Sequence, residues 1–120
     1  SPYIDKGKLL EKMTRYNDAI ENYKEIISIN PNSSYALFRI AFCFEKNHDY
    51  NNSLKYYYKC INEDPNMDKA FFRLSMYFYR LKDFKKAIDF IEKAIKLNQE
   101  KSKYWKIYLN CLSKTSTKNY

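Results

Sequence analysis

A step of 34 residues recurs through the chain and constrains its fold more than any other feature. Pro31 and Pro65 lie one step apart, in the similar segments INPNSSYALF and EDPNMDKAFF. Five further registers follow the same step: Tyr3, Leu37, Phe71 and Trp105; Leu10, Phe44, Phe78 and Leu112; Tyr16, Tyr50 and Phe84; Ala19, Ser53 and Ala87; Tyr23, Tyr57 and Ile91. Chance does not bring six registers into phase, and a period of this length indicates units that stack on their neighbours.

The composition favours helices within each unit. One glycine and three prolines leave little turn chemistry for sheets, and a hydrophobic fraction of 45% is too high for a disordered chain. We therefore expect two helices per unit, joined by the short turns KMTR, KNHD and RLKD. A small residue in each second helix, Ala19, Ser53 or Ala87, lets the two helices approach closely. Since neither helix buries its apolar stripe alone, stacking of at least three units completes the core.

These units resemble the tetratricopeptide repeat family, whose pattern is an aromatic residue, then Leu-Gly, then Tyr, and later Ala, Phe, Ala and Pro. The matching residues are Tyr3, Gly7, Leu10, Ala19, Tyr23 and Pro31 in the first unit, Leu37, Ala41, Phe44, Tyr57 and Pro65 in the second, and Phe71, Leu74, Ser75, Phe78, Ala87 and Ala94 in the third. Ser53 replaces the usual alanine, and Gln99 stands where the third proline is expected.

The resemblance covers about residues 2–112 and implies an all-α fold. It implies a right-handed α-α superhelix, or solenoid, of three helix-turn-helix repeats at about 1–33, 34–67 and 68–101, plus a seventh, capping helix at about 102–114. In that helix we expect Trp105, Tyr108 and Leu112 to face the third repeat, with Lys103, Lys106 and Lys114 facing water. Residues 115–120 are expected to form a frayed tail. The opening SPYIDKGKLL leads us to expect one domain, excised from a longer protein.

The segment DKAFFRLSMYFYR, residues 68–80, carries two apolar stripes on one predicted helix. Phe71, Leu74, Ser75 and Phe78 follow the i, i+3, i+4, i+7 spacing at the packing positions of the repeat, so we assign them to the core. The other stripe corresponds to the positions that line the concave groove in the family. Extended over the neighbouring repeats, it predicts a partner-binding groove formed by Tyr35, Phe38, Arg39, Phe42, Lys46, Lys69, Phe72, Arg73, Met76, Tyr79, Arg80 and Lys106.

Charge is unevenly distributed along the chain. Residues 1–65 hold 9 basic and 9 acidic residues, whereas residues 66–120 hold 13 basic and 5 acidic residues and so carry the whole net charge of +8. A groove that combines aromatic residues with a basic C-terminal part suits a protein or peptide ligand that carries apolar anchors and acidic groups. The sequence therefore predicts a protein-interaction module. A scaffold subunit that docks through its ends or its convex face is the alternative within the same class.

A chaperone tail is one possible ligand. The family's co-chaperones grip the C-terminal carboxylate of heat-shock chaperones with five residues, of which Lys69 and Arg73 match the two in the third repeat. Ile4 replaces the first lysine, Lys8 the first asparagine and Arg39 the second asparagine. The clamp is thus incomplete, and loss of both asparagines removes the amides that hold a peptide backbone.

Nucleic acid is the alternative ligand of another class, because aromatic residues beside Lys and Arg can stack on bases and neutralise phosphates. Glu11 and Glu45 interrupt the groove, which disfavours this interpretation.

The sequence indicates no enzyme, metal site or cofactor: His48 has no paired nucleophile, and one glycine cannot build a phosphate loop. No apolar run is long enough to span a bilayer. The cysteines Cys43, Cys60 and Cys111 are expected to be buried packing residues in an intracellular protein, cytoplasmic or nuclear.

Overall fold

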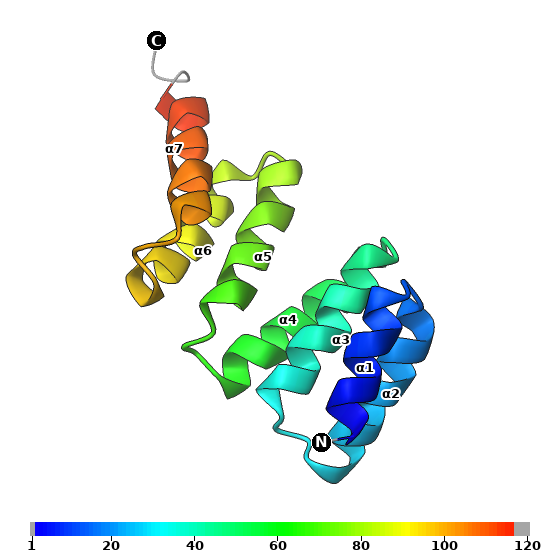
Figure 1. Ribbon diagram of the computed structural model, residues 1–120. Helices are drawn as coiled ribbons and strands as arrows, with labels where there is room; N and C mark the ends of the chain where they lie inside the picture. Colours follow the sequence, from blue (N-terminus) through cyan, green and yellow to red (C-terminus); the bar gives the residue numbers. More distant parts are fainter. Residues whose placement is uncertain (1, 117–120) are drawn as a thin grey trace. The chain divides into compact units, whose positions relative to one another are not determined.

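The computed structural model describes residues 2–116, which form seven helices and no strand (Figure 1). The helices are α1 (Pro2–Lys12), α2 (Tyr16–Ile29), α3 (Ser34–Lys46), α4 (Tyr50–Glu63), α5 (Asp68–Arg80), α6 (Phe84–Leu97) and α7 (Ser102–Ser116). The all-α prediction is confirmed. The chain divides into two compact units: unit 1, Ser1–Pro65, holds α1 to α4, and unit 2, Asn66–Tyr120, holds α5 to α7. The single domain expected over residues 1–120 stays a prediction, and the expected frayed tail lies mostly outside the described residues.

The turn inside each repeat has the same unusual backbone. Thr14, His48 and Lys82, one repeat step apart, adopt left-handed φ angles of 56°, 60° and 63°. The residue after each closes the turn, because its N–H donates to a carbonyl in the last turn of the first helix: Arg15 to Leu10, Asp49 to Phe44 and Asp83 to Phe78, each at 2.9 Å. This arrangement ends a helix and reverses the chain. The predicted turns KMTR, KNHD and RLKD are therefore confirmed.

Small residues let the two helices of a repeat touch. In α1, a Cβ atom on the buried Gly7 would lie 2.8 Å from the Tyr23 hydroxyl oxygen, so only glycine fits there. Serine hydroxyls take the equivalent contacts in the other repeats. Ser53 donates to the Ala41 carbonyl at 3.0 Å, and Ser75 donates to the Ala87 carbonyl at 2.8 Å. Each serine thus satisfies its buried polar atom across the helix pair that it allows to close.

Both cores follow the repeat registers. In unit 1 a buried cluster contains Leu10, Ala19, Ile20, Tyr23, Ile40 and Cys43. In unit 2 the residues that we assigned to the core of α5, Phe71, Leu74, Ser75 and Phe78, are all buried. The three cysteines are free and buried, and burial raises the pKa of the Cys43 and Cys60 thiols to about 12. They are the inert packing residues that the sequence predicted.

The packing of α7 differs from the prediction. Tyr104 and Cys111 are fully buried and Ile107 packs beside Phe78, whereas Trp105 and Leu112 are 41% and 38% exposed. The helix is therefore rotated about its own axis by roughly 100°, the angle between successive residues, from the expected orientation. The prediction that Trp105 and Leu112 pack on the third repeat is therefore wrong, because Tyr104 and Cys111 take those positions, whereas Tyr108 is half-buried beside α6. Lys103, Lys106 and Lys114 are exposed, as expected.

No helix among the described residues is long and apolar enough to cross a membrane.

Candidate functional site

The unit 1 part of the predicted groove lies on α3. Tyr35 and Lys46 are exposed, Phe42 and Arg39 are half-buried, and Phe38 is only 6% exposed. The Phe38 ring packs against Tyr57, with 5.7 Å between the ring centroids. Phe38 therefore has little surface left for a ligand. Phe42 is more accessible and lies beneath two cations, with the Arg39 guanidinium 4.7 Å and the Lys46 ammonium 5.3 Å from its ring centroid.

Arg39 is held by a carboxylate from another helix. Its guanidinium forms a two-point ion pair with Glu11 of α1, and the Tyr23 hydroxyl donates to the same carboxylate at 2.5 Å. Burial alone would lower the pKa of Arg39, but the hydrogen bond and the charge of Glu11 outweigh it and raise that pKa. Burial and Glu11 together also raise the pKa of Tyr23. The charge of Arg39 is thus already neutralised within unit 1.

In unit 2 the predicted site centres on the Phe72 ring of α5. Phe72 is 7% exposed and packs on Tyr104 of α7, with 5.0 Å between the ring centroids. The Tyr104 hydroxyl donates to Asp68 at 2.6 Å, and Asn98 also donates to that carboxylate. Burial, followed by Asp68, raises the pKa of Tyr104. These contacts fix the start of α7 against the start of α5, so residues from both helices surround one ring.

Two cations contact that ring. The Lys103 ammonium lies 4.9 Å and the Arg73 guanidinium 5.8 Å from the Phe72 centroid. The pKa of Lys103 is lowered, first by partial burial and then by the positive charges of Lys101, Arg73 and Lys69, with Asp68 opposing. We call Lys69, Arg73, Lys101 and Lys103 the basic cluster. Lys69, Lys101 and Lys103 form no ion pair within residues 2–116, so much of its charge faces solvent unneutralised.

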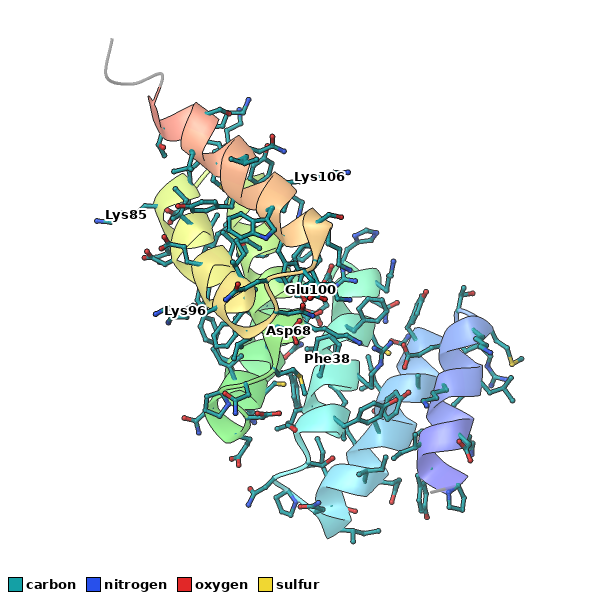
Figure 2. All side chains as sticks on the ribbon, turned by 60° about the vertical axis from the view of Figure 1, so that its left-hand side comes forward. Phe38, Asp68, Lys85, Lys96, Glu100 and Lys106 are labelled. Atoms are coloured by element: carbon teal, nitrogen blue, oxygen red, sulfur yellow. The ribbon has the colours of Figure 1, made fainter. Side chains whose placement is uncertain are left out.

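The remaining predicted residues lie around this cluster. Met76 and Tyr79 are half-buried on α5, and the Tyr79 ring packs edge-on against Phe84 at 5.6 Å. Arg80 is exposed at the end of α5. Lys106 projects from α7, whereas Lys85 and Lys96 project from α6 on the other side of the unit (Figure 2).

Sequence reasoning missed Lys101. Lys103 stands one repeat step after Lys69 and shares its register on the groove stripe, but the predicted site includes only Lys106 from this helix. Lys101 lies just before α7, and no basic residue at the same register in the earlier repeats points to it. The site has the chemistry of anion recognition, since it offers ammonium and guanidinium donors around an apolar ring. No cluster of metal-ligating side chains occurs within the described part of the chain.

Successive antiparallel helix pairs, with left-handed turns and small residues repeated every 34 positions, define a helical-repeat protein. The chain belongs to the tetratricopeptide repeat family. Three models of this repeat match residues 1–33, 35–66 and 68–101.

Solved tetratricopeptide repeat domains share the fold at low sequence identity. The first TPR of Spaghetti (RPAP3), bound to the HSP90 peptide SRMEEVD, is 14% identical over 93% of this chain and 89% of that one, with a TM-score of 0.85. The TPR2B domain of yeast Sti1, in a complex with pHsp70, is 19% identical over 93% and 94% of the two chains, with a TM-score of 0.82. The Sgt2 TPR domain from Aspergillus fumigatus is 20% identical over 98% and 80%, with a TM-score of 0.85. A search of curated proteins finds no match.

Proposed function

We propose that this protein is an interaction module that binds an acidic peptide segment of a partner protein, with the basic cluster of unit 2 as the principal contact. The observation that carries the proposal is the placement of Lys103 and Arg73, from two helices, against the same Phe72 ring. Because like charges repel, cations gathered in this way favour an anionic ligand that relieves the repulsion. Met76 and Lys106 flank the cluster and supply apolar and further basic contacts.

The roles of the predicted residues differ within this proposal. Phe38 and Phe72 support the surface from below, since each is less than a tenth exposed. Arg39 binds Glu11 and is therefore less suited to a ligand carboxylate than Lys69 or Lys103, which form no ion pair within residues 2–116. Tyr35, Phe42 and Lys46 of unit 1, and Tyr79 and Arg80 of unit 2, remain predicted ligand contacts.

Likeness to peptide-binding domains supports the proposal only by analogy. The peptide in the Spaghetti structure, SRMEEVD, has three acidic residues. It is a suitable first probe for the chemistry proposed here. The two family clamp positions that this chain retains, Lys69 and Arg73, both belong to the basic cluster, whereas the three it lacks lie in unit 1.

Fluorescence anisotropy with labelled SRMEEVD tests the proposal. We expect micromolar binding, which Lys103→Glu weakens about tenfold because the substitution reverses a charge inside the cluster. The matched control is Lys85→Glu, which makes the same charge change at an exposed position on α6 and is expected to alter affinity by less than about threefold. SRMQQVN, in which amides replace the acidic side chains, should bind weakly.

Equal loss of affinity in both variants would contradict a localised site, and so would undiminished binding of SRMQQVN. A single-stranded oligonucleotide that binds the chain more tightly than the peptide at the same salt concentration would favour the nucleic-acid alternative instead. Phe72→Ala is a poor probe, because removal of a buried ring destabilises the unit and confounds any loss of binding.

A further inference from the structure

Helix α7 carries a second apolar stripe that the described helices cover only in part. Trp105, Tyr108, Leu109 and Leu112 follow the i, i+3, i+4, i+7 spacing of an amphipathic helix, and we call them the outer stripe. Trp105, Leu109 and Leu112 are 41%, 59% and 38% exposed. The adjacent stripe of the same helix, roughly 100° round the axis and formed by Tyr104, Ile107 and Cys111, packs into unit 2. A helix that merely capped the repeats would present a polar outer face.

The repeat register shows what usually covers such a stripe. Trp105 and Leu112 correspond, one step earlier, to Phe71 and Phe78 of α5, which are only 6% and 8% exposed. Both of those rings stack on Phe90 of α6, at centroid distances of 6.3 and 5.7 Å. The second helix of the repeat therefore buries these two registers. In α7 the same registers lack that helix among the described residues.

A hollow of about 570 Å³ lies beside the outer stripe, between α6 and α7. Its apolar wall comes from Ile95, Trp105 and Tyr108, and its rim from Asp89, Glu92, Lys93 and Lys96. The indole orientation is set, because the Trp105 Nε1–H donates to the Gln99 carbonyl at 2.8 Å and the ring packs edge-on against Tyr108 at 6.1 Å. Stripe and hollow form one continuous apolar surface, because Trp105 and Tyr108 belong to both.

Leu109 is too large for the close packing that the second helix of a repeat makes at this register. The same register holds Gly7, Ala41 and Ser75, small residues at which the second helix makes close contact. A leucine keeps an approaching helix at a greater distance. The occupant is therefore shifted relative to a second repeat helix.

Charge selects among possible occupants. Helix α7 has Lys103, Lys106 and Lys114 and no acidic residue, in a unit whose sequence carries a net charge of +8. A second copy of the chain would bring the same basic helix to this surface, and the two would repel. We propose that the outer stripe and its hollow dock an amphipathic helix of a partner protein, with leucine-like residues toward Trp105 and Leu109 and acidic residues along its flanks. This surface is distinct from the basic cluster around Phe72, and the proposal does not depend on the function proposed above.

Trp105 supplies the readout, because it is the only tryptophan in the sequence. The probes are three synthetic peptides of about 18 residues without tryptophan, a length that supports helix formation. One has leucines at i, i+3, i+4 and i+7 with glutamates elsewhere, one replaces the glutamates by lysines, and one scrambles the leucine–glutamate sequence. We expect only the amphipathic glutamate peptide to shift Trp105 emission to shorter wavelength and to protect it from acrylamide quenching.

A matched pair of variants locates the effect. Leu109→Glu should weaken binding of the glutamate peptide about tenfold or more, whereas Leu81→Glu should leave it unchanged. Both leucines are 59% exposed, so neither substitution is expected to unfold the protein, and helical circular dichroism verifies this. Unweakened binding to Leu109→Glu would overturn the proposal, as would an equal shift from the scrambled or lysine peptide.

Two further results separate helix docking on the outer stripe from self-association and from peptide binding at the basic cluster. A blue shift that grows with protein concentration in the absence of peptide, accompanied by dimers in light scattering, would assign the stripe to self-association and overturn the proposal. Leu109→Glu should leave SRMEEVD binding intact, and Lys69→Glu should weaken SRMEEVD binding while preserving the Trp105 response. Failure of one proposal is therefore distinguishable from failure of the other.

Discussion

Glu11 joins three elements of unit 1 through one carboxylate. It lies on α1, accepts the Tyr23 hydroxyl of α2 and pairs with Arg39 of α3. The Glu11 side chain is 10% exposed and the Arg39 side chain 25% exposed, so water screens the pair only partly. A nearby surface pair provides the contrast: Lys24 and Glu21 are 3.8 Å apart with exposures of 45% and 76%. Burial rather than the presence of an ion pair decides which of the two matters for stability.

We predict that Glu11→Gln lowers the free energy of unfolding by about 2 kcal/mol, because it leaves the Arg39 charge partly buried without its partner. Glu21→Gln, the same chemical change at the exposed pair, should alter it by no more than about 0.5 kcal/mol. Urea denaturation followed by circular dichroism measures both. Similar values for the two variants would mean that the Glu11 network adds no more than a surface contact.

At the scale of the element, the turns inside the repeats adopt a backbone that glycine would normally occupy. Thr14, His48 and Lys82 all have left-handed φ angles, and in an L-residue this conformation costs about 1–2 kcal/mol. Thr14 is the least favourable of the three, because a β-branched side chain crowds the backbone most in this region. The turns therefore have the usual geometry of a helix end, but the residues at their left-handed positions are not the most stabilising ones.

Thr14→Gly should raise the free energy of unfolding by up to about 1 kcal/mol, since relief of the left-handed strain exceeds the extra chain entropy of glycine in the unfolded state. Lys82→Gly should have a smaller effect in the same direction. Thermal unfolding of the two variants and of the parent chain tests whether Thr14→Gly is stabilised more than Lys82→Gly. A loss of stability in Thr14→Gly would show that the threonine side chain, whose hydroxyl donates to the Met13 carbonyl, contributes more than its backbone costs.

At the scale of the whole molecule, the dominant property is the separation of charge along the chain. Residues 1–65 are neutral and residues 66–120 carry a net charge of +8, so the electrostatic field originates in unit 2. Such a field speeds the encounter with an acidic ligand more than it lengthens the lifetime of the complex.

Binding of SRMEEVD should therefore weaken by about an order of magnitude when NaCl rises from about 0.05 to 0.5 M, mostly through a slower association rate. Stopped-flow anisotropy separates the two rate constants. SRMQQVN serves as the control and should show little dependence on salt. A salt effect confined to the dissociation rate would assign the interaction to short-range contacts instead of the field of unit 2.

Most of the fold was predictable because it depends on local or periodic features. The repeat step placed the small residues, the turns and the core stripe of α5, and all of these occur as predicted. The site was less predictable. The register marked Phe38 and Phe72 as groove residues, but their rings are buried against Tyr57 and Tyr104, because a long aromatic side chain on the groove face can lean into the neighbouring helix. Lys101 and Lys103 join the site only through the docking of α7 on α5.

The sequence by itself determined that this chain forms paired helices of the tetratricopeptide type, where each pair closes, and which half carries the charge. These properties follow from spacing, residue size and composition, which act over one or two helical turns or add up along the chain. Only the tertiary structure decided that Glu11 neutralises Arg39 across 28 residues, and that α7 buries Tyr104 and leaves Trp105 at the surface. The reason is physical: a helix with two apolar stripes can bury either one, and the choice depends on the angle and distance at which the neighbouring helix packs.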